Sequence, residues 1–113
     1  MESKRMVPQV NESDWRVFRQ KLPEWQERHM ETLLQEYAAL IAGPGAASDR
    51  FWALGKRIKA DKRQTGVVAQ MSRSNMYLNI IDLLSEGAIT LQDLDSFSDE
   101  LREKMVFVMR DRV

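Results

Sequence analysis

The sequence contains no cysteine, a single histidine, and only five glycines and three prolines among its 113 residues. Without cysteine the chain forms no disulfide, has no thiol nucleophile and offers no thiolate to a metal ion. Its apolar runs are a few residues long, far short of the roughly 20 residues that span a bilayer. The first ten residues contain no apolar segment of signal-peptide length. These absences favour a soluble, cytoplasmic protein with no membrane partner.

The net formal charge is zero, yet the two signs are concentrated in different parts of the chain. Residues 49–73 contain seven basic and two acidic side chains, whereas residues 82–103 contain seven acidic side chains and one basic side chain. Such segregation bears on partners and on electrostatic steering, and it does not determine a fold. The fold must be predicted from the apolar pattern.

Apolar residues recur at helical spacing through most of the chain, and no segment alternates with the period of a strand. This pattern predicts an all-α fold, a compact bundle of five to six helices with no sheet. Residues 1–10 have no periodicity and are predicted to form a loose lead-in. Because 113 residues are the size of one domain, residues 11–113 are predicted to be a single helical domain.

Proline, glycine and capping residues predict where the helices begin and end. Pro23 suits a first helical turn, so we expect a short helix over residues 14–22 and a separate long helix that ends at Gly43. The other helices are expected over residues 49–63, 67–86, 91–97 and 99–112, beginning at Ser48, after Gly66, at a capping box of Thr90 and Asp93, and at Ser98. The helix over 67–86 is apolar nearly all round in its second half, which predicts a central place in the bundle.

Catalytic chemistry has few candidate groups in this sequence. His29 is the only histidine and lacks an evident partner, so we expect it at the surface. Gln26 stands where the Glu-x-x-His pattern of di-metal bundles has glutamate. Three glutamates share one face of the long helix, a pattern that is usually solvated (Glu24, Glu27 and Glu31). No nucleophile elbow, phosphate loop or zinc motif is present, and we predict a protein that is not an enzyme and needs no cofactor or metal.

The predicted helix over residues 49–63 has two different faces. Apolar residues are expected to form its inner face (Phe51, Leu54 and Ile58), and an aromatic ring lies among cations on the opposite face (Trp52, Lys56, Lys59 and Arg63). The second face suits stacking on a nucleobase while cations bind phosphates. It equally suits a protein interface, where Trp and Arg are enriched. The third interpretation is that Trp52 packs beneath another element and the cations are solvated.

The acidic C-terminal region allows two interpretations as well. Its carboxylates fall near the starts of two short helices, where they complement helix dipoles without any partner. Alternatively they form an acidic interaction face that meets a basic groove, with the ring of Phe107 on the same side of the last helix. The residues of this predicted face are Asp93, Asp95, Asp99, Glu100, Glu103 and Phe107.

Four segments carry a family resemblance: residues 11–27 (NESDWRVFRQKLPEWQE), 51–62 (FWALGKRIKADK), 71–76 (MSRSNM) and 86–101 (EGAITLQDLDSFSDEL). Together they resemble a family of small helical proteins linked to mobile elements of Firmicutes, whose members are often labelled multidrug transporters. That label conflicts with the lack of a membrane span in this sequence. The resemblance brings no catalytic motif, so it assigns no site residue.

Mobile elements of such bacteria often carry small non-enzymatic inhibitors of host defence, including anti-CRISPR proteins. The resemblance therefore implies an inhibitor or adaptor that blocks a protein or ribonucleoprotein machine, most concretely a type II effector nuclease or its guide complex. The charge segregation is compatible with this role. The alternative is a nucleic-acid-binding accessory or regulatory protein that uses the basic helix on RNA or DNA.

Overall fold

The computed structural model describes residues 10–111, and four α-helices lie within them. They are α1 (Glu12–Ala42), α2 (Ala47–Asp61), α3 (Met76–Glu86) and α4 (Asp99–Arg110), with two short 3₁₀ turns, η2 (Arg73–Asn75) and η3 (Leu91–Leu94). The described residues contain no strand, so the all-α class is confirmed, while the predicted number of five to six helices is too high. Residues 1–9 of the predicted lead-in lie outside the described residues.

The two helices predicted on either side of Pro23 are one helix. α1 runs for 31 residues with Pro23 inside it, although a proline in a helix interior costs about 3 kcal/mol. Pro23 itself is exposed, whereas Leu22 and Trp25 beside it are buried. Burying each large apolar side chain is worth about 1.5–3 kcal/mol. One continuous buried stripe along α1 therefore outweighs the penalty of the proline.

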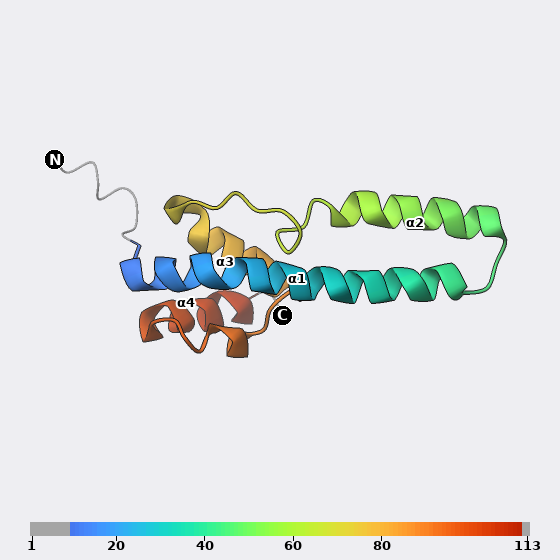
Figure 1. Cartoon of the computed structure of the whole chain (residues 1–113). Helices are drawn as coiled ribbons and strands as arrows, with labels where there is room; N and C mark the ends of the chain where they lie inside the picture. The colour runs from blue at the N-terminus through green and yellow to red at the C-terminus, as the bar shows by residue number, and fades with distance from the viewer. Residues whose placement is uncertain (1–9, 112–113) are drawn as a thin grey trace.

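The hydrophobic core lies in one part of the molecule, which we call the body: the N-terminal half of α1 with α3, η3 and α4 (Figure 1). Its most deeply buried apolar side chains are Phe18, Leu22, Met76, Ile80, Leu83, Leu94, Leu101 and Met105. Four aromatic rings follow one another through this core with centroid separations of 6.1 to 6.3 Å, namely Trp15, Phe18, Trp25 and Phe97. The core is thus shared by the N-terminal half of the long helix α1 and three shorter elements, and it does not surround one central helix.

The expected central helix over residues 67–86 is helical only in its second part. α3 begins at Met76, and residues 62–72 form an irregular connection that runs back along α1 (Figure 1). A buried amide holds this connection outside the helix, because Asn79 Nδ2 donates to Gln70 O at 3.0 Å. α3 is also not buried all round, since Leu78 is 61% exposed.

The capping signals of the body are confirmed. The Thr90 N–H donates to Asp93 Oδ2 at 2.7 Å and begins η3, which is shorter than the predicted helix. Ser98 Oγ accepts from the Leu101 N–H at 3.2 Å and donates to Oδ2 of the buried Asp14 at 2.6 Å. Ser98 therefore both caps α4 and ties it to the first turn of α1.

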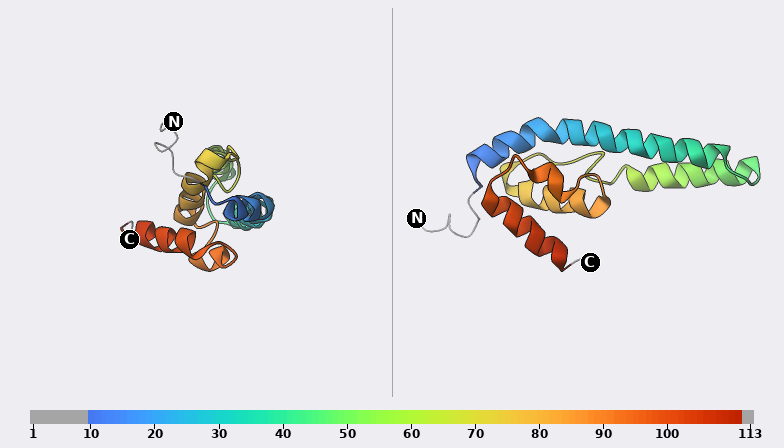
Figure 2. Two further views of the ribbon diagram at one scale, coloured as in Figure 1. Left: turned by 90° about the vertical axis from the view of Figure 1, so that its left-hand side faces the viewer. Right: turned by 90° about the horizontal axis from the view of Figure 1, so that it is seen from below.

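Beyond the body, the C-terminal part of α1 and the whole of α2 project as an antiparallel two-helix arm (Figures 1 and 2). The molecule measures 62 × 28 × 28 Å, and its radius of gyration is 17.3 Å, against about 13 Å for a compact chain of this length. The expected compact bundle is therefore wrong in shape. The predicted stop at Gly43 is confirmed, but α2 begins at Ala47 without a side-chain cap, so that Ser48 lies inside the helix.

Candidate functional site

The arm is held together by a small polar cluster and by half-buried apolar contacts. Asp61 is the only buried residue of α2. Its carboxylate accepts from the Tyr37 hydroxyl at 2.6 Å and pairs with Arg57 Nε at 2.9 Å, and Arg57 also pairs with Glu36. Burial and the hydrogen bond to the Asp61 carboxylate raise the pKa of Tyr37 to about 12. This cluster fixes where α2 lies along α1.

The predicted inner face of α2 is wrong in one position. Leu54 and Ile58 are half-buried, but Phe51 is 65% exposed. Its ring meets that of Trp52 edge-to-face with centroids 5.1 Å apart. A two-helix arm has no third helix to cover the outer part of an apolar face, and so Phe51 stays in solvent.

The predicted cationic residues and Trp52 form an exposed surface, which we call the basic arm face: Trp52, Lys56, Lys59 and Arg63. Trp52 is 72% exposed, so the interpretation that it packs beneath another element is wrong for the described chain. Arg63 lies in the turn that follows α2, and its backbone N–H donates to Ala60 O at 3.2 Å. Within residues 10–111, no side-chain hydrogen bond or ion pair engages the three cations.

The predicted acidic residues are not equally free. Asp93 is half-buried and paired at the surface of the body, where Arg28 Nη1 and Nη2 donate to its two oxygens at 3.2 and 3.0 Å. Burial opposes the ionised form, yet the Thr90 N–H and the Arg28 guanidinium together lower the pKa of Asp93. Asp99 pairs with Arg102 one turn along α4. The carboxylates that stay exposed without an ion pair in the described chain are Asp95, Glu100 and Glu103.

Phe107 lies where the acidic interpretation expects it, on the outer side of α4. Its ring is exposed, as is Val106 beside it. Both line an open groove together with charged residues of the same helix, namely Asp99, Arg102, Glu103 and Arg110. The groove mixes both charge signs, and only part of the predicted acidic face therefore borders it.

His29 is buried, and its predicted surface position is wrong. Its Nε2 lies 2.7 Å from Gln64 Oε1, and Gly66 is so close that an added Cβ would lie 2.4 Å from His29 Cδ2. The signal that identifies this site is the spacing of Leu22, Trp25 and His29, which continues the buried stripe of α1. No carboxylate is bonded to the ring, and in the described chain no group of three acidic, histidine or cysteine side chains is arranged to hold a metal ion.

The residues around His29 join the arm to the body, and we call them the junction: Gln26, His29, Gln64, Thr65, Gly66 and Glu86. Gln26 Nε2 donates to Thr65 O at 3.0 Å. The Glu86 carboxylate accepts from the N–H groups of Thr65 and Gly66 at 2.8 and 3.0 Å. Side chains of α1 and α3 thus bond the backbone groups of the segment that follows α2. No pattern in the sequence predicts these long-range hydrogen bonds.

Among the described residues, none of the helices is sufficiently long and apolar to span a membrane. Comparisons with protein-family models, with curated proteins and with solved structures find no match to this chain. The resemblance to a mobile-element family therefore stays a prediction, and the arm and its exposed side chains are the basis on which a function is proposed.

Proposed function

We propose that the protein is a non-enzymatic inhibitor or adaptor that binds a host machine through its helical arm. The observation that carries the proposal is the basic arm face, in which an exposed tryptophan lies among three cations without a partner in the described chain. Tryptophan and arginine are enriched among the residues that contribute most to interfaces. The face lies on an arm that projects beyond the body (Figure 1), where a partner can reach it without contacting the body.

A binding role is consistent with the buried histidine and carboxylates, which make structural contacts within the fold. The one histidine is packed against Gln64 and Gly66 in the junction. Asp14 and Asp61, the buried carboxylates, serve to cap and tie helices. Because these side chains are engaged in structural bonds, they support a role in which the surface, and not an internal cleft, carries the activity.

In its most concrete form, the partner is a type II CRISPR effector nuclease or its guide complex. A guide complex presents phosphates that the basic arm face would neutralise, and its nucleic-acid channel is basic, which suits the exposed carboxylates of α4. The protein would then obstruct the machine without cutting anything. This proposal combines the family resemblance with the charge placement of the arm and of α4.

The experiment is co-purification with candidate effectors, followed by a DNA-cleavage assay. We expect association and lower cleavage with the natural chain, and loss of both when Lys56→Glu and Lys59→Glu are combined with Trp52→Ala. Lys21→Glu is the control for charge reversal outside the arm, because Lys21 lies in the part of α1 that belongs to the body. Undiminished cleavage across several effectors, with no association, contradicts the proposal.

The second candidate is a nucleic-acid-binding accessory protein, which the unpaired cations beside an exposed indole favour. Binding should weaken steadily with salt, since each neutralised phosphate releases counterions. Trp52→Ala should cost about 1–3 kcal/mol of binding free energy if a base stacks on the ring. A fluorescence titration with RNA and with DNA at low salt measures both effects. Absence of binding at micromolar protein excludes this candidate and leaves the protein partner.

A further inference from the structure

One flank of the arm is apolar along its whole length. Leu34 and Ile41, two helical turns apart on α1, are 58% and 51% exposed. Phe51 and Ile58 have the same spacing on α2, where Phe51 is exposed and Ile58 is half-buried. Together with the half-buried Tyr37 and Leu54 between the helices, these side chains form what we call the apolar flank.

Contacts across the arm show that the exposed apolar residues of α1 and of α2 lie on the same side of the arm. Leu34 and Tyr37 border an almost wholly apolar hollow with Asp61 and Lys62 from the end of α2. The opposite side has a different hollow, bordered by Ala39, Leu40, Asp49, Arg50 and Ala53. On α2, Asp49 and Ala53 lie on that opposite side, and Arg57 and Asp61 face α1. At about 100° per residue, Phe51 and Ile58 lie beyond Asp61, on the side of Leu34. The apolar flank is therefore shared by both helices.

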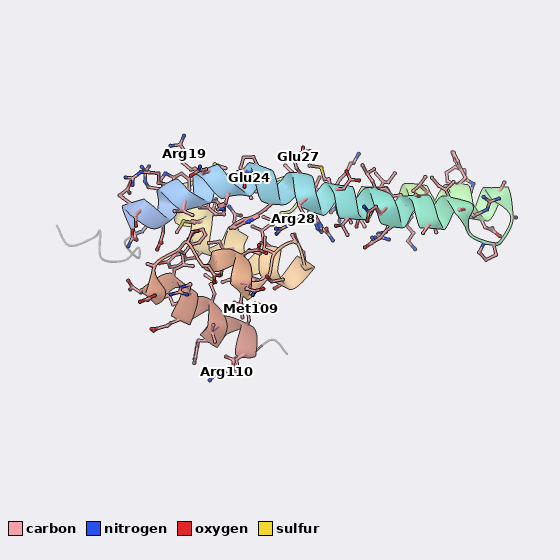
Figure 3. All side chains as sticks on the ribbon, turned by 60° about the horizontal axis from the view of Figure 1, so that its bottom comes forward. Arg19, Glu24, Glu27, Arg28, Met109 and Arg110 are labelled. Carbon is pink, nitrogen blue, oxygen red and sulfur yellow. The ribbon has the colours of Figure 1, made fainter. Side chains whose placement is uncertain are left out.

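The two edges of the apolar flank carry opposite charges. On α1, Glu27 and Glu31 precede Leu34 on the same side of the helix, and Figure 3 shows Glu27 on the edge of α1 turned away from α4. On α2, Lys59 and Lys62 lie beside Ile58 at the other edge. All four are exposed, and none has a side-chain ion pair in the described chain. The flank is thus complementary to its own copy.

We infer that the apolar flank is a dimer interface in which a second copy of this chain packs its own arm, so that the two arms form a four-helix bundle. This inference goes beyond the proposed function and does not depend on the identity of any other partner. A symmetric dimer needs a self-complementary patch, and two arrangements of the arms satisfy that requirement.

Charge selects between these arrangements. If the two-fold axis runs along the arms, both arms point the same way and α1 of each copy lies over α2 of the other. The acidic edge then meets the basic edge twice, with Glu31 closest to Lys62, because Asp61 lies level with Leu34 and Tyr37. If the axis crosses the arms, α1 lies over α1 and the two arms run in opposite directions. Glu31 and Lys62 lie at the body end of each arm, so they would face the tip of the partner's arm and form no pair with each other. The charge pattern therefore predicts arms that point in the same direction.

The size of the flank sets the expected strength of the dimer. α2 has 15 residues, so the paired part of the arm is about 22 Å long, and two adjacent helices are about 20 Å wide. The footprint is roughly 450 Å² per copy, below the about 800 Å² per partner of a standard stable interface. We therefore expect a reversible dimer that dissociates in the micromolar range.

The first test measures mass in solution by sedimentation across the micromolar range for the full chain. We expect a monomer–dimer equilibrium that Leu34→Glu or Phe51→Glu shifts by at least about tenfold toward monomer. Both positions are exposed, so neither change should lower the helix content measured by circular dichroism. Leu78→Glu is the matched control, because Leu78 is equally exposed but lies on α3. A monomer at every concentration, or a dimer indifferent to both flank changes, overturns the inference.

The second test determines the direction of the arms. Glu31→Lys and Lys62→Glu should each weaken the dimer, and the two changes combined in one chain should restore it. Because the chain has no cysteine, Ser48→Cys introduces one spin-label site near the arm tip. Labels at the same end of the bundle give a short distance, as expected. Labels separated by a further arm length of about 22 Å, or failure of the charge swap to restore the dimer, contradict the proposed arrangement.

Discussion

The body and the arm are both helical and both rich in aromatic side chains, but they hold these side chains in opposite ways. In the body, Trp15 and Trp25 are buried among rings and aliphatic side chains from four elements. In the arm, the rings of Phe51 and Trp52 meet edge-to-face and both remain largely exposed to solvent. The difference shows that an aromatic residue at helical spacing indicates core only where a third element is present to cover it.

The largest effect expected is loss of the body on placing a charge in its core. Ile80 is completely buried on α3, so Ile80→Asp introduces an unpaired carboxylate that costs several kcal/mol. Since domains are stable by only about 5–15 kcal/mol, we expect severe destabilisation, measured by chemical denaturation followed by circular dichroism. Leu34→Asp, an exposed change on the arm, is the control and should leave the fold intact. A comparable loss in both variants would break the distinction between the two regions.

The next effect is expected at the junction, where body and arm meet. Gly66→Ala places a Cβ 2.4 Å from His29 Cδ2 and 3.1 Å from Ala88 Cβ. Relief requires movement of a buried ring, and overpacking of this kind typically costs about 1–3 kcal/mol. Urea denaturation of Gly66→Ala, His29→Ala and the double variant measures the coupling. The clash predicts that Gly66→Ala is less harmful when His29 is already alanine, and strict additivity contradicts it.

The features that the sequence predicts correctly depend on neighbouring residues, whereas those it misses depend on long-range contacts. The capping residues Ser98 and Thr90 and the stop at Gly43 act through their nearest neighbours along the chain, and their predicted places are confirmed. Pro23 and His29 depend on elements distant in the sequence, which supply the burial that keeps α1 continuous and the amide that faces the imidazole ring. Local patterns cannot contain that information.

The residues that form the candidate site could be predicted from the sequence, but the elements that surround them could not. The helical spacing of Trp52, Lys56 and Lys59 places them together, as the structure does on α2. The spacing does not show that, in the described residues, no third helix covers the arm, and so it does not predict that Phe51 is exposed. It also does not predict the long-range pair of Arg28 with Asp93, which removes one carboxylate from the predicted acidic face. Both depend on how separate helices meet.

A smaller effect is expected from the polar cluster of the arm. Tyr37→Phe removes the hydroxyl that donates to Asp61 and should cost about 1 kcal/mol. The pKa of Tyr37 in the fold, about 12, lies above its ordinary value of 10.0. The fold therefore favours the neutral ring, and this stabilisation is complete below pH 10 and is lost as the pH rises toward 12.

Tyrosinate absorbance tests this assignment directly. The natural chain should show a late-titrating tyrosine near pH 12, accompanied by loss of helical signal from the arm. Tyr37→Phe should remove the late titration, whereas Tyr77→Phe should retain it, although burial also raises the pKa of Tyr77. If Tyr77→Phe removes the late step and Tyr37→Phe does not, the polar cluster is not what holds the arm.

The smallest effect is expected where the two regions differ most, at the exposed rings of the arm. Phe51→Ser and Trp52→Ser should each change the free energy of unfolding by no more than about 0.5 kcal/mol, because solvent already surrounds most of each ring. The matched change in the body, Phe97→Ser, removes a buried ring and should cost about 3–5 kcal/mol. Denaturation must be measured at protein concentrations low enough to keep the chain monomeric, since the apolar flank includes Phe51. A penalty for Phe51→Ser near that of Phe97→Ser would mean that the ring is covered in solution, and the arm would then have to be regarded as a second core.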